Sequence, residues 1–276
     1  MTHVPLRRLA LVAAAAATLL VGAVGCADGP QEVETPGGYT VTLVNPDKLT
    51  VCTHLPYVPF QYKAGDEIVG FDVDIVDLIA AELGLEQELV DMDFNQINNG
   101  AALSGNRCDL AAAGMTITDE RAKNITFSDP YFDEVVAFLS PKGEPVESIE
   151  QVKEDELSLG VQASTTSLSY AKDNDVEPRE FPDSAKQKLA LESGQVDVIL
   201  QDLPVLQEWL ATDDSFAEDF ELGGVIETGS HYGLGMKKDA DERLVEVVND
   251  VLAESKSNEK YDEIYARWFE AEAEAS

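Results

Sequence analysis

Short apolar runs alternate with amphipathic segments along most of the chain. Residues 49–53 (LTVCT) are apolar enough to predict a buried strand, and residues 88–91 and 109–113 predict two more. Between them, residues 70–83 and 98–103 predict helices. The first of these has its apolar side chains on one face, at Val73, Val76, Ile79, Ala80 and Leu83. This alternation indicates an α/β fold with a mostly parallel sheet and helices on both faces.

The same order of elements recurs later in the chain. Residues 157–161 and 196–200 predict strands, and a helix is expected at 184–192. The segment ALSGNRCDLAAA (102–113) is echoed by LALESGQVDVIL (189–200), since both read helix, Ser-Gly stop, Asp and apolar strand. Two lobes of similar design follow. We expect crossings between the lobes at residues 134–140 and 225–232, and a helical tail over 241–269.

The first 25 residues are typical of a secretory signal peptide. Arg7 and Arg8 precede an apolar run that ends at Ala23-Val24-Gly25-Cys26. A membrane-spanning anchor is the alternative, but a run of this length is marginal for crossing a bilayer. The ending resembles the bacterial lipoprotein signal, which implies lipid attachment to Cys26 after cleavage. Residues 26–46 then predict a flexible tether, and the protein is expected outside the cytoplasm, held to the cell membrane by lipid alone.

Charge and cysteine content narrow the partners further. The chain has 53 acidic and 19 basic residues, a formal net charge of −34. A groove for nucleic acid needs clustered Lys and Arg, so no nucleic acid is expected. If Cys26 carries lipid, Cys52 and Cys108 remain as a pair, and exported thiol pairs tend to oxidise. Two free buried cysteines are the alternative.

Enzyme motifs for serine hydrolases, zinc peptidases and nucleotide binding do not occur in the sequence, and no metal or cofactor is expected. Instead, residues 114–121 (GMTITDER) follow a predicted strand directly. Gly114 permits close approach to a ligand, and Arg121 offers a planar fork for a carboxylate. In the other half, residues 160–166 (GVQASTT) suit an anion if a helix begins there, and Asp202 suits an ammonium. Together they predict a clamp for a zwitterion.

Several stretches resemble one family. The stretches are 58–62 (VPFQY), 70–75 (GFDVDI), 114–121 (GMTITDER), 127–131 (FSDPY), 232–233 (YG) and 264–269 (IYARWF). In this order they resemble the extracellular solute-binding proteins of ABC importers for polar amino acids, the group of the glutamine-binding protein. The resemblance implies a type II periplasmic-binding-protein fold with two hinge strands. It places residues 47–136 and 230–276 in lobe 1 and residues 137–229 in lobe 2.

The resemblance also implies roles for single residues. Arg121 would bind the ligand's α-carboxylate with the N–H groups of Thr116 and Thr165. Asp202 would take the α-ammonium with Gly114 and Thr116, while Tyr57 and Phe94 flank the ligand side chain. The remaining residues expected at the ligand are Ala113, Thr166, Gln201, His54 and Gln162.

Three positions depart from the glutamine-binding pattern. His54 stands where the pattern has Asp, Gln162 where it has Lys, and Gln201 where it has His. A neutral His can donate one hydrogen bond and accept another, and a Gln can do both. The pair His54 and Gln162 therefore predicts an uncharged polar terminus such as an amide, so a glutamine-like ligand is favoured.

The implied function is capture of a free polar amino acid and its delivery to an ABC transporter permease. The alternative is an enzyme, because the same fold hosts periplasmic dehydratases of cyclic amino-acid precursors. One covalent prediction follows from the fold. In a lobe with strand order 2-1-3, the strands that carry Cys52 and Cys108 are neighbours, and neighbouring strands lie close enough for a disulfide between them.

Overall fold

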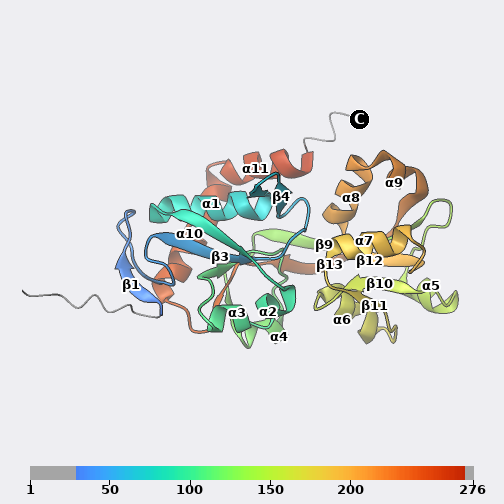
Figure 1. Ribbon diagram of the computed structural model, residues 1–276, viewed down its shortest axis with the longest axis horizontal. Helices are drawn as coiled ribbons and strands as arrows, with labels where there is room; N and C mark the ends of the chain where they lie inside the picture. The colour runs from blue at the N-terminus through green and yellow to red at the C-terminus, as the bar shows by residue number, and fades with distance from the viewer. Residues whose placement is uncertain (1–28, 271–276) are drawn as a thin grey trace, which may run out of the picture.

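The computed structural model describes residues 29–270, so the predicted signal peptide and Cys26 lie outside the described part. Two five-stranded sheets lie beside each other along the long axis (Figure 1). The sheet of the first lobe has the strand order β6-β3-β7-β14-β8. From one edge to the other these strands are β6 (Glu86–Asp91), β3 (Lys48–Thr53), β7 (Leu110–Ala111), β14 (Gly235–Lys237) and β8 (Ile125–Phe127). The sheet of the second lobe has the strand order β11-β10-β12-β9-β13. From one edge to the other these strands are β11 (Arg179–Phe181), β10 (Leu159–Gln162), β12 (Val198–Asp202), β9 (Phe132–Pro141) and β13 (Phe220–Tyr232).

Both sheets have the same pattern of strand directions. In the first, β3 is parallel to β6 and β7, whereas β14 is antiparallel to β7 and β8. In the second, β10 is parallel to β11 and β12, whereas β9 is antiparallel to β12 and β13. Four of the five strands of each sheet therefore run in one direction, which confirms the expectation of a mostly parallel sheet, and β14 and β9 are the antiparallel exceptions. These two strands run the opposite way because each enters its sheet directly from the other lobe, β9 after β8 and β14 after β13, without a helical crossover.

Helices cover the sheets of both lobes. The first lobe has α1 (Phe71–Leu83), α2 (Phe94–Asn98), α3 (Ala101–Ser104), α4 (Asp119–Ala122), α10 (Glu242–Ser257), α11 (Lys260–Tyr265) and the π-helix η1 (Ala266–Glu270). Those of the second lobe are α5 to α9, with bounds Ile149–Glu154, Thr166–Asp173, Ser184–Glu192, Leu203–Thr212 and Asp214–Asp219. The single helix expected at 98–103 is instead two helices, because Gly100 adopts a φ of +78° between them.

The start of the described chain is folded. Strands β1 (Gln31–Glu34) and β2 (Thr40–Leu43) form an antiparallel pair. Val41 and Leu43 are fully buried in the core, and the backbone N–H of Thr42 donates to the Asp241 carboxylate at 2.8 Å. The predicted tether is therefore wrong for this stretch. Apolar residues alternate with polar ones along β2, so Val41 and Leu43 share one face of the strand, and this face packs on the first lobe.

Two strands connect the lobes. The chain leaves the first sheet after β8, enters the second at β9, and returns from β13 to β14. β9 and β13 pair with each other along most of their length. The predicted lobe boundaries, after residues 136 and 229, fall inside these two strands, and that division of the chain stays a prediction. A separate small hairpin is formed by β4 (Tyr62–Ala64) and β5 (Glu67–Val69).

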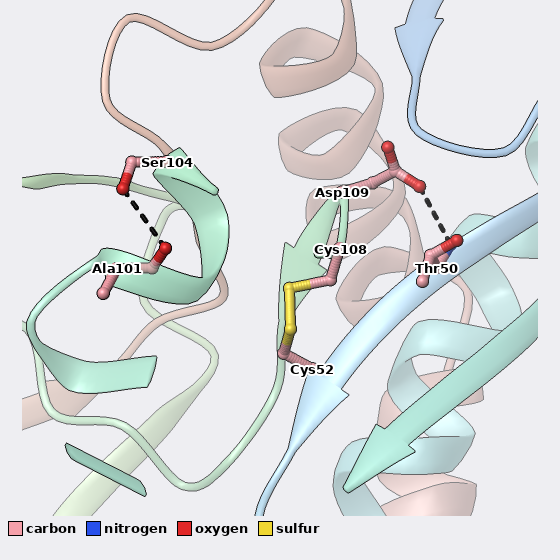
Figure 2. Close-up of a disulfide and its surroundings, with 6 residues drawn as sticks. All are labelled: Thr50, Cys52, Ala101, Ser104, Cys108 and Asp109. Carbon is pink, nitrogen blue, oxygen red and sulfur yellow. Dashed lines mark hydrogen bonds between the residues drawn. A yellow bond between two sulfur atoms is a disulfide. The ribbon is translucent and has the colours of Figure 1, made fainter. Parts of the chain in front are cut away.

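A disulfide joins the two neighbouring strands of the first lobe (Figure 2). The α-carbons of Cys52 and Cys108 are 5.6 Å apart, within the range a disulfide needs. Cys52 lies in β3 and Cys108 stands two residues before β7, as the order 2-1-3 predicts. Both cysteines pack in a buried cluster that includes Phe94 and Ala113, so the disulfide supports the wall behind these two residues.

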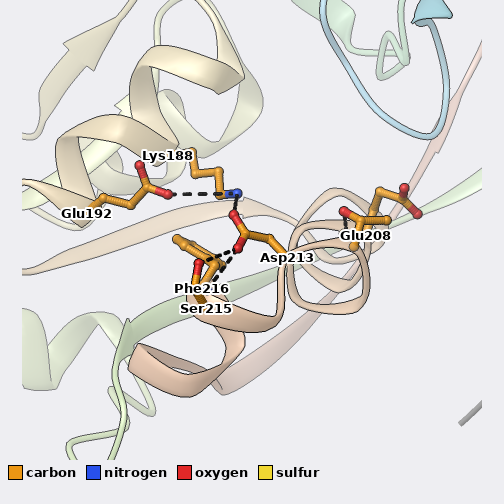
Figure 3. A network of polar contacts seen from close by, with 7 residues as sticks. Lys188, Glu192, Glu208, Asp213, Ser215 and Phe216 are labelled. Carbon is orange, nitrogen blue, oxygen red and sulfur yellow. Dashed lines mark hydrogen bonds and ion pairs between the residues drawn. The ribbon is translucent and has the colours of Figure 1, made fainter.

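The second lobe has a polar network near its surface (Figure 3). The Lys188 ammonium lies 2.9 Å from the Asp213 carboxylate and 3.8 Å from Glu192. Asp213 also accepts from the Ser215 hydroxyl and the Phe216 N–H, which caps α9. These contacts, with Lys188 first, lower the pKa of Asp213 to about 2.

Within residues 29–270, no helix has the length and apolar character needed to cross a membrane.

Candidate functional site

One pocket between the lobes brings together every residue that the sequence placed at the ligand. Its empty space is about 360 Å³. The lining residues come from strand ends and helix starts of both lobes: His54, Tyr57, Gln61, Phe94, Ala113, Gly114, Thr116, Arg121, Gln162, Thr165, Thr166, Gln201 and Asp202. Twelve of these thirteen residues were expected, and Gln61 was not. The role of each in ligand binding stays a prediction.

The turn at Gly114 shapes one side of the pocket. Its φ is +53°, and a β-carbon there would lie 2.8 Å from a ring carbon of Tyr57, so only glycine fits. The Gly114 N–H donates to the buried Asp72 carboxylate at 2.8 Å, and the Tyr131 hydroxyl donates to the same group at 2.7 Å. Burial raises the pKa of Asp72 to about 6. Asp72 therefore fixes the turn from behind.

Arg121 is held by backbone carbonyls from both lobes. It is 7% exposed and belongs to α4, which Thr118 caps by accepting from the Arg121 N–H. Its guanidinium donates to the Thr116 carbonyl at 2.8 Å and to the Ser164 carbonyl at 3.2 Å. The group also lies over the Phe94 ring, 5.6 Å from the centroid. Two of five N–H groups are thereby used, which leaves donors for a carboxylate.

Asp202 faces the pocket from the second lobe, where it ends β12 and precedes α8. The hydroxyls of Tyr57 and Tyr232 both donate to its carboxylate, so residues from two lobes meet at this group. Burial raises the pKa of Asp202 to about 7, and nearby Glu134 adds to the rise. The two hydroxyls and Arg121 oppose it. A ligand ammonium would supply the countercharge that this buried carboxyl group lacks.

A buried acid, Glu134, lies beside these groups and was not expected from the sequence. It is 3% exposed and accepts from the hydroxyls of Thr116 at 2.5 Å and Thr166 at 2.8 Å. Burial lowers the pKa of Arg121, whereas Glu134 and Asp202 oppose that change. We call Arg121, Asp202 and Glu134 the charged group. Strand alternation around Phe132 could have indicated that Glu134 points inward, since the two residues share one face of β9.

Three other lining residues carry unpaired acceptors. Within the described residues, His54 Nε2, Gln61 Oε1 and Gln162 Oε1 are buried atoms with no hydrogen-bond partner. We call these residues the acceptor group. His54 Nδ1 lies 2.8 Å from the Met92 carbonyl, which can only accept, so Nδ1 carries the proton. Neutral His54 therefore has only an acceptor left for a ligand, whereas the sequence-based argument gave it both a donor and an acceptor.

The remaining predicted residues are engaged by the protein itself. The Gln201 amide donates to Gln187 at 2.8 Å and accepts from the Asp202 N–H at 2.8 Å, which leaves it a supporting role behind Asp202. Thr165 caps α6 through the Leu168 N–H. The first N–H groups of α6 have no intrahelical partner and can bind a carboxylate. No group of three or more His, Cys, Asp or Glu in residues 29–270 could hold a metal ion.

The fold and the pocket define a two-lobed binding protein, and comparison with known proteins supports this class. The chain belongs to the bacterial extracellular solute-binding proteins, family 3, whose model matches residues 49–271. Recognition of the family and of its α/β fold from the sequence is thereby confirmed.

Two relatives come from Bacillus subtilis (strain 168). The ABC transporter glutamine-binding protein GlnH is 30% identical, over 91% of this chain and 93% of its own. The arginine-binding extracellular protein ArtP is 30% identical, over 82% of this chain and 87% of its own. A solved structure of an ancestral arginine-binding protein bound to glutamine superposes with a TM-score of 0.75 and 33% identity, covering 81% and 98% of the two chains.

Proposed function

We propose that the protein captures a polar α-amino acid outside the cytoplasm and delivers it to an ABC transporter permease. One observation carries the proposal. A guanidinium from the first lobe and a carboxyl group from the second, both more than nine-tenths buried, line the same pocket. Arg121 would bind the α-carboxylate and Asp202 the α-ammonium, an arrangement that matches a zwitterion. The ligand then bridges the two lobes and stabilises the closed state that a permease recognises.

A thermal-shift screen over the common amino acids tests this function. A ligand at one hundred times its dissociation constant stabilises the protein by about 2.7 kcal/mol, and amino acids without affinity leave the melting temperature unchanged. The preference for a glutamine-like ligand, predicted from His54 and Gln162, stays a prediction that the same screen tests. If none of the common amino acids raises the melting temperature, the proposed function is wrong.

Attachment to the cell membrane through a lipid on Cys26 belongs to the same proposal. The signal-like residues before Cys26 support it. Metabolic labelling with a fatty acid should mark the protein, and Cys26→Ala should release it to the medium or periplasm. Label retained by the Cys26→Ala protein would contradict lipidation at this residue.

Dehydratase chemistry is the second candidate, since the pocket holds a carboxyl group, Asp202, whose pKa of about 7 suits a general acid. We propose that this group serves binding and not catalysis, because two tyrosine hydroxyls donate to it and fix it as an acceptor. Incubation with cyclic hydroxy-acid precursors of aromatic amino acids, followed by mass spectrometry, distinguishes the two. Loss of water at a rate that Asp202→Asn abolishes would establish the enzyme.

A further inference from the structure

The acceptor group limits what a ligand side chain can offer. His54 Nδ1 donates to the Met92 carbonyl at 2.8 Å, so Nε2 of the neutral ring is a bare acceptor. It is buried and has no partner within the described residues. A ligand atom that meets Nε2 must therefore carry a hydrogen, and a carbonyl or carboxylate oxygen placed there would meet lone pair against lone pair.

Gln61 acts in the same direction. Its Nε2 donates to the His54 carbonyl at 3.4 Å, so the Oε1 atom of the same amide remains as an acceptor. The side chain is 1% exposed, and Oε1 has no partner among residues 29–270. Gln162, 3% exposed, adds a third unpaired oxygen. Burying an acceptor without a partner costs about 1–3 kcal/mol, so a ligand that supplies donors recovers this free energy.

The charged group has an excess of negative charge. Asp202 and Glu134 are two buried carboxyl groups against a single buried guanidinium, Arg121. A zwitterion adds one positive and one negative charge and leaves this excess unchanged. A ligand with one further positive charge neutralises it, and buried charges are stable only when they are paired.

The walls of the pocket are flat. Tyr57 and Phe94 both line it, and each is 6% exposed. Phe94 already has the Arg121 guanidinium over its ring, 5.6 Å from the centroid. Aromatic faces attract cations, and a planar guanidinium can also stack against them.

We propose that the acceptor group selects a cationic side chain that only donates, with a guanidinium as the best fit. This inference rests on the proposed function, because it assumes an α-amino acid in the clamp. It names L-arginine as the class representative. It assigns His54, Gln61 and Gln162 the role of specificity residues and Glu134 the role of a charge-balancing residue. It differs from the amide preference predicted from the sequence, in which His54 would also donate a hydrogen bond, because the proton of His54 is used by the Met92 carbonyl.

Calorimetric titration with matched ligands tests the inference on the unmodified protein. L-Citrulline has the shape of L-arginine but carries a urea oxygen in place of one cationic nitrogen group, so it is neutral and presents an acceptor. We expect L-arginine to bind at least about tenfold more tightly than L-citrulline and L-glutamine at pH 7.5. Equal affinity for arginine and citrulline, or tighter binding of glutamine, would overturn the inference while the proposed function stands. Absence of binding by all three would overturn the inference, and the proposed function would fall with it only if no common amino acid raised the melting temperature in the screen.

Glu134→Gln tests the charge argument, with Glu144→Gln as the matched control. Glu144 is exposed on a loop after β9, so the same change there alters the net charge equally. We expect Glu134→Gln to lower the arginine-to-glutamine affinity ratio by about tenfold and Glu144→Gln to leave it unchanged. Using the ratio removes any general weakening through Thr116 and Thr166. An unchanged ratio in Glu134→Gln would overturn the role assigned to Glu134.

Discussion

The charged group and the acceptor group share one pocket but differ in how completely their polar atoms are paired. Arg121 donates to two carbonyls, Asp202 accepts from two tyrosines, and Glu134 accepts from two threonines. The acceptor group, in contrast, has three buried atoms without partners in the described chain. Under the proposed function, the charged group would bind the part that is common to all α-amino acids. The acceptor group would be completed by a ligand and would decide among side chains.

We therefore expect the charged group to control the affinity for every amino-acid ligand and the acceptor group to control which ligand is preferred. A change in the charged group should affect every amino-acid ligand, because all of them present the same carboxylate and ammonium. A change in the acceptor group should reorder the ligands, because each side chain presents different donors and acceptors.

The largest effect is expected for Arg121→Ala. Removing one partner of a buried charge pair costs about 2–5 kcal/mol, so every amino-acid ligand should bind roughly 30- to 4000-fold more weakly. Arg121→Lys should also bind poorly, because an ammonium lacks the planar fork. Calorimetry measures both. The matched control is Arg107→Ala, since Arg107 is exposed and does not line the pocket. Normal affinity in either Arg121 variant would disprove the clamp.

The next effect concerns stability and not affinity. Replacing Cys52 and Cys108 by Ser together removes a crosslink between positions 56 residues apart, and the chain-entropy model assigns such a loop about 4 kcal/mol. Denaturant unfolding should show this loss. Ligand selectivity should stay the same if the wall of Phe94 keeps its place by packing. A reordering of ligands in the double variant would mean that the disulfide positions the acceptor group.

A smaller effect is expected for Tyr232→Phe. The Tyr232 hydroxyl lowers the pKa of Asp202, which burial raises to about 7, so removing the hydroxyl raises this pKa further. Protonated Asp202 cannot pair with an ammonium, so ligand affinity in the unmodified protein should rise with pH through about 7 and then level off. In Tyr232→Phe the rise should move to higher pH by about one unit.

Affinity at pH 7 should therefore fall by about fivefold in Tyr232→Phe and recover near pH 9. Titrations of one ligand across this pH range provide the measurement. A profile that falls as pH rises through 7, or one that Tyr232→Phe does not move, would contradict the assignment of Asp202 to the ammonium.

The smallest effect is expected for Lys188→Ala in the surface network of the second lobe (Figure 3). Lys188 pairs with Asp213 and Glu192 near the surface, where its side chain is 20% exposed, and ion pairs that water reaches contribute little. The melting temperature should fall by about 2 °C or less, and ligand affinity should stay the same. A loss of affinity would show that the network is coupled to the pocket. Ligand affinity would then depend on residues outside the charged group and the acceptor group.

The sequence by itself determined the family, the two lobes and twelve of the residues that line the pocket, and the ligand-binding roles of these residues stay predictions. These depend on local signals: an apolar strand that stops at Gly114, and Asp202 at the end of another strand. Because α/β sheets place ligand sites at the carboxyl ends of their strands, local order put each residue at the ligand edge of its own lobe, and both edges face the same pocket. The same reasoning placed Cys52 beside Cys108.

Local sequence patterns predict less where burial depends on a distant surface. The Gly and Pro residues within 31–43 predict a tether, yet Val41 and Leu43 pack in a core contributed mostly by later residues. The helix expected at 98–103 is interrupted because Gly100 packs against Asn124, where a β-carbon would lie 2.8 Å from a carbonyl oxygen. Neither partner is visible from the local pattern.

Only the tertiary structure decided the state of the acceptor group and the burial of Glu134. The proton on His54 is set by the Met92 carbonyl, 38 positions away, and Gln201 is occupied by Gln187 and the Asp202 N–H. Glu134 is buried because Thr116 and Thr166, from different lobes, both donate to it. The physical reason is common to these cases. Residue type determines which hydrogen bonds are possible, but partners brought close by folding determine which donors and acceptors remain for a ligand.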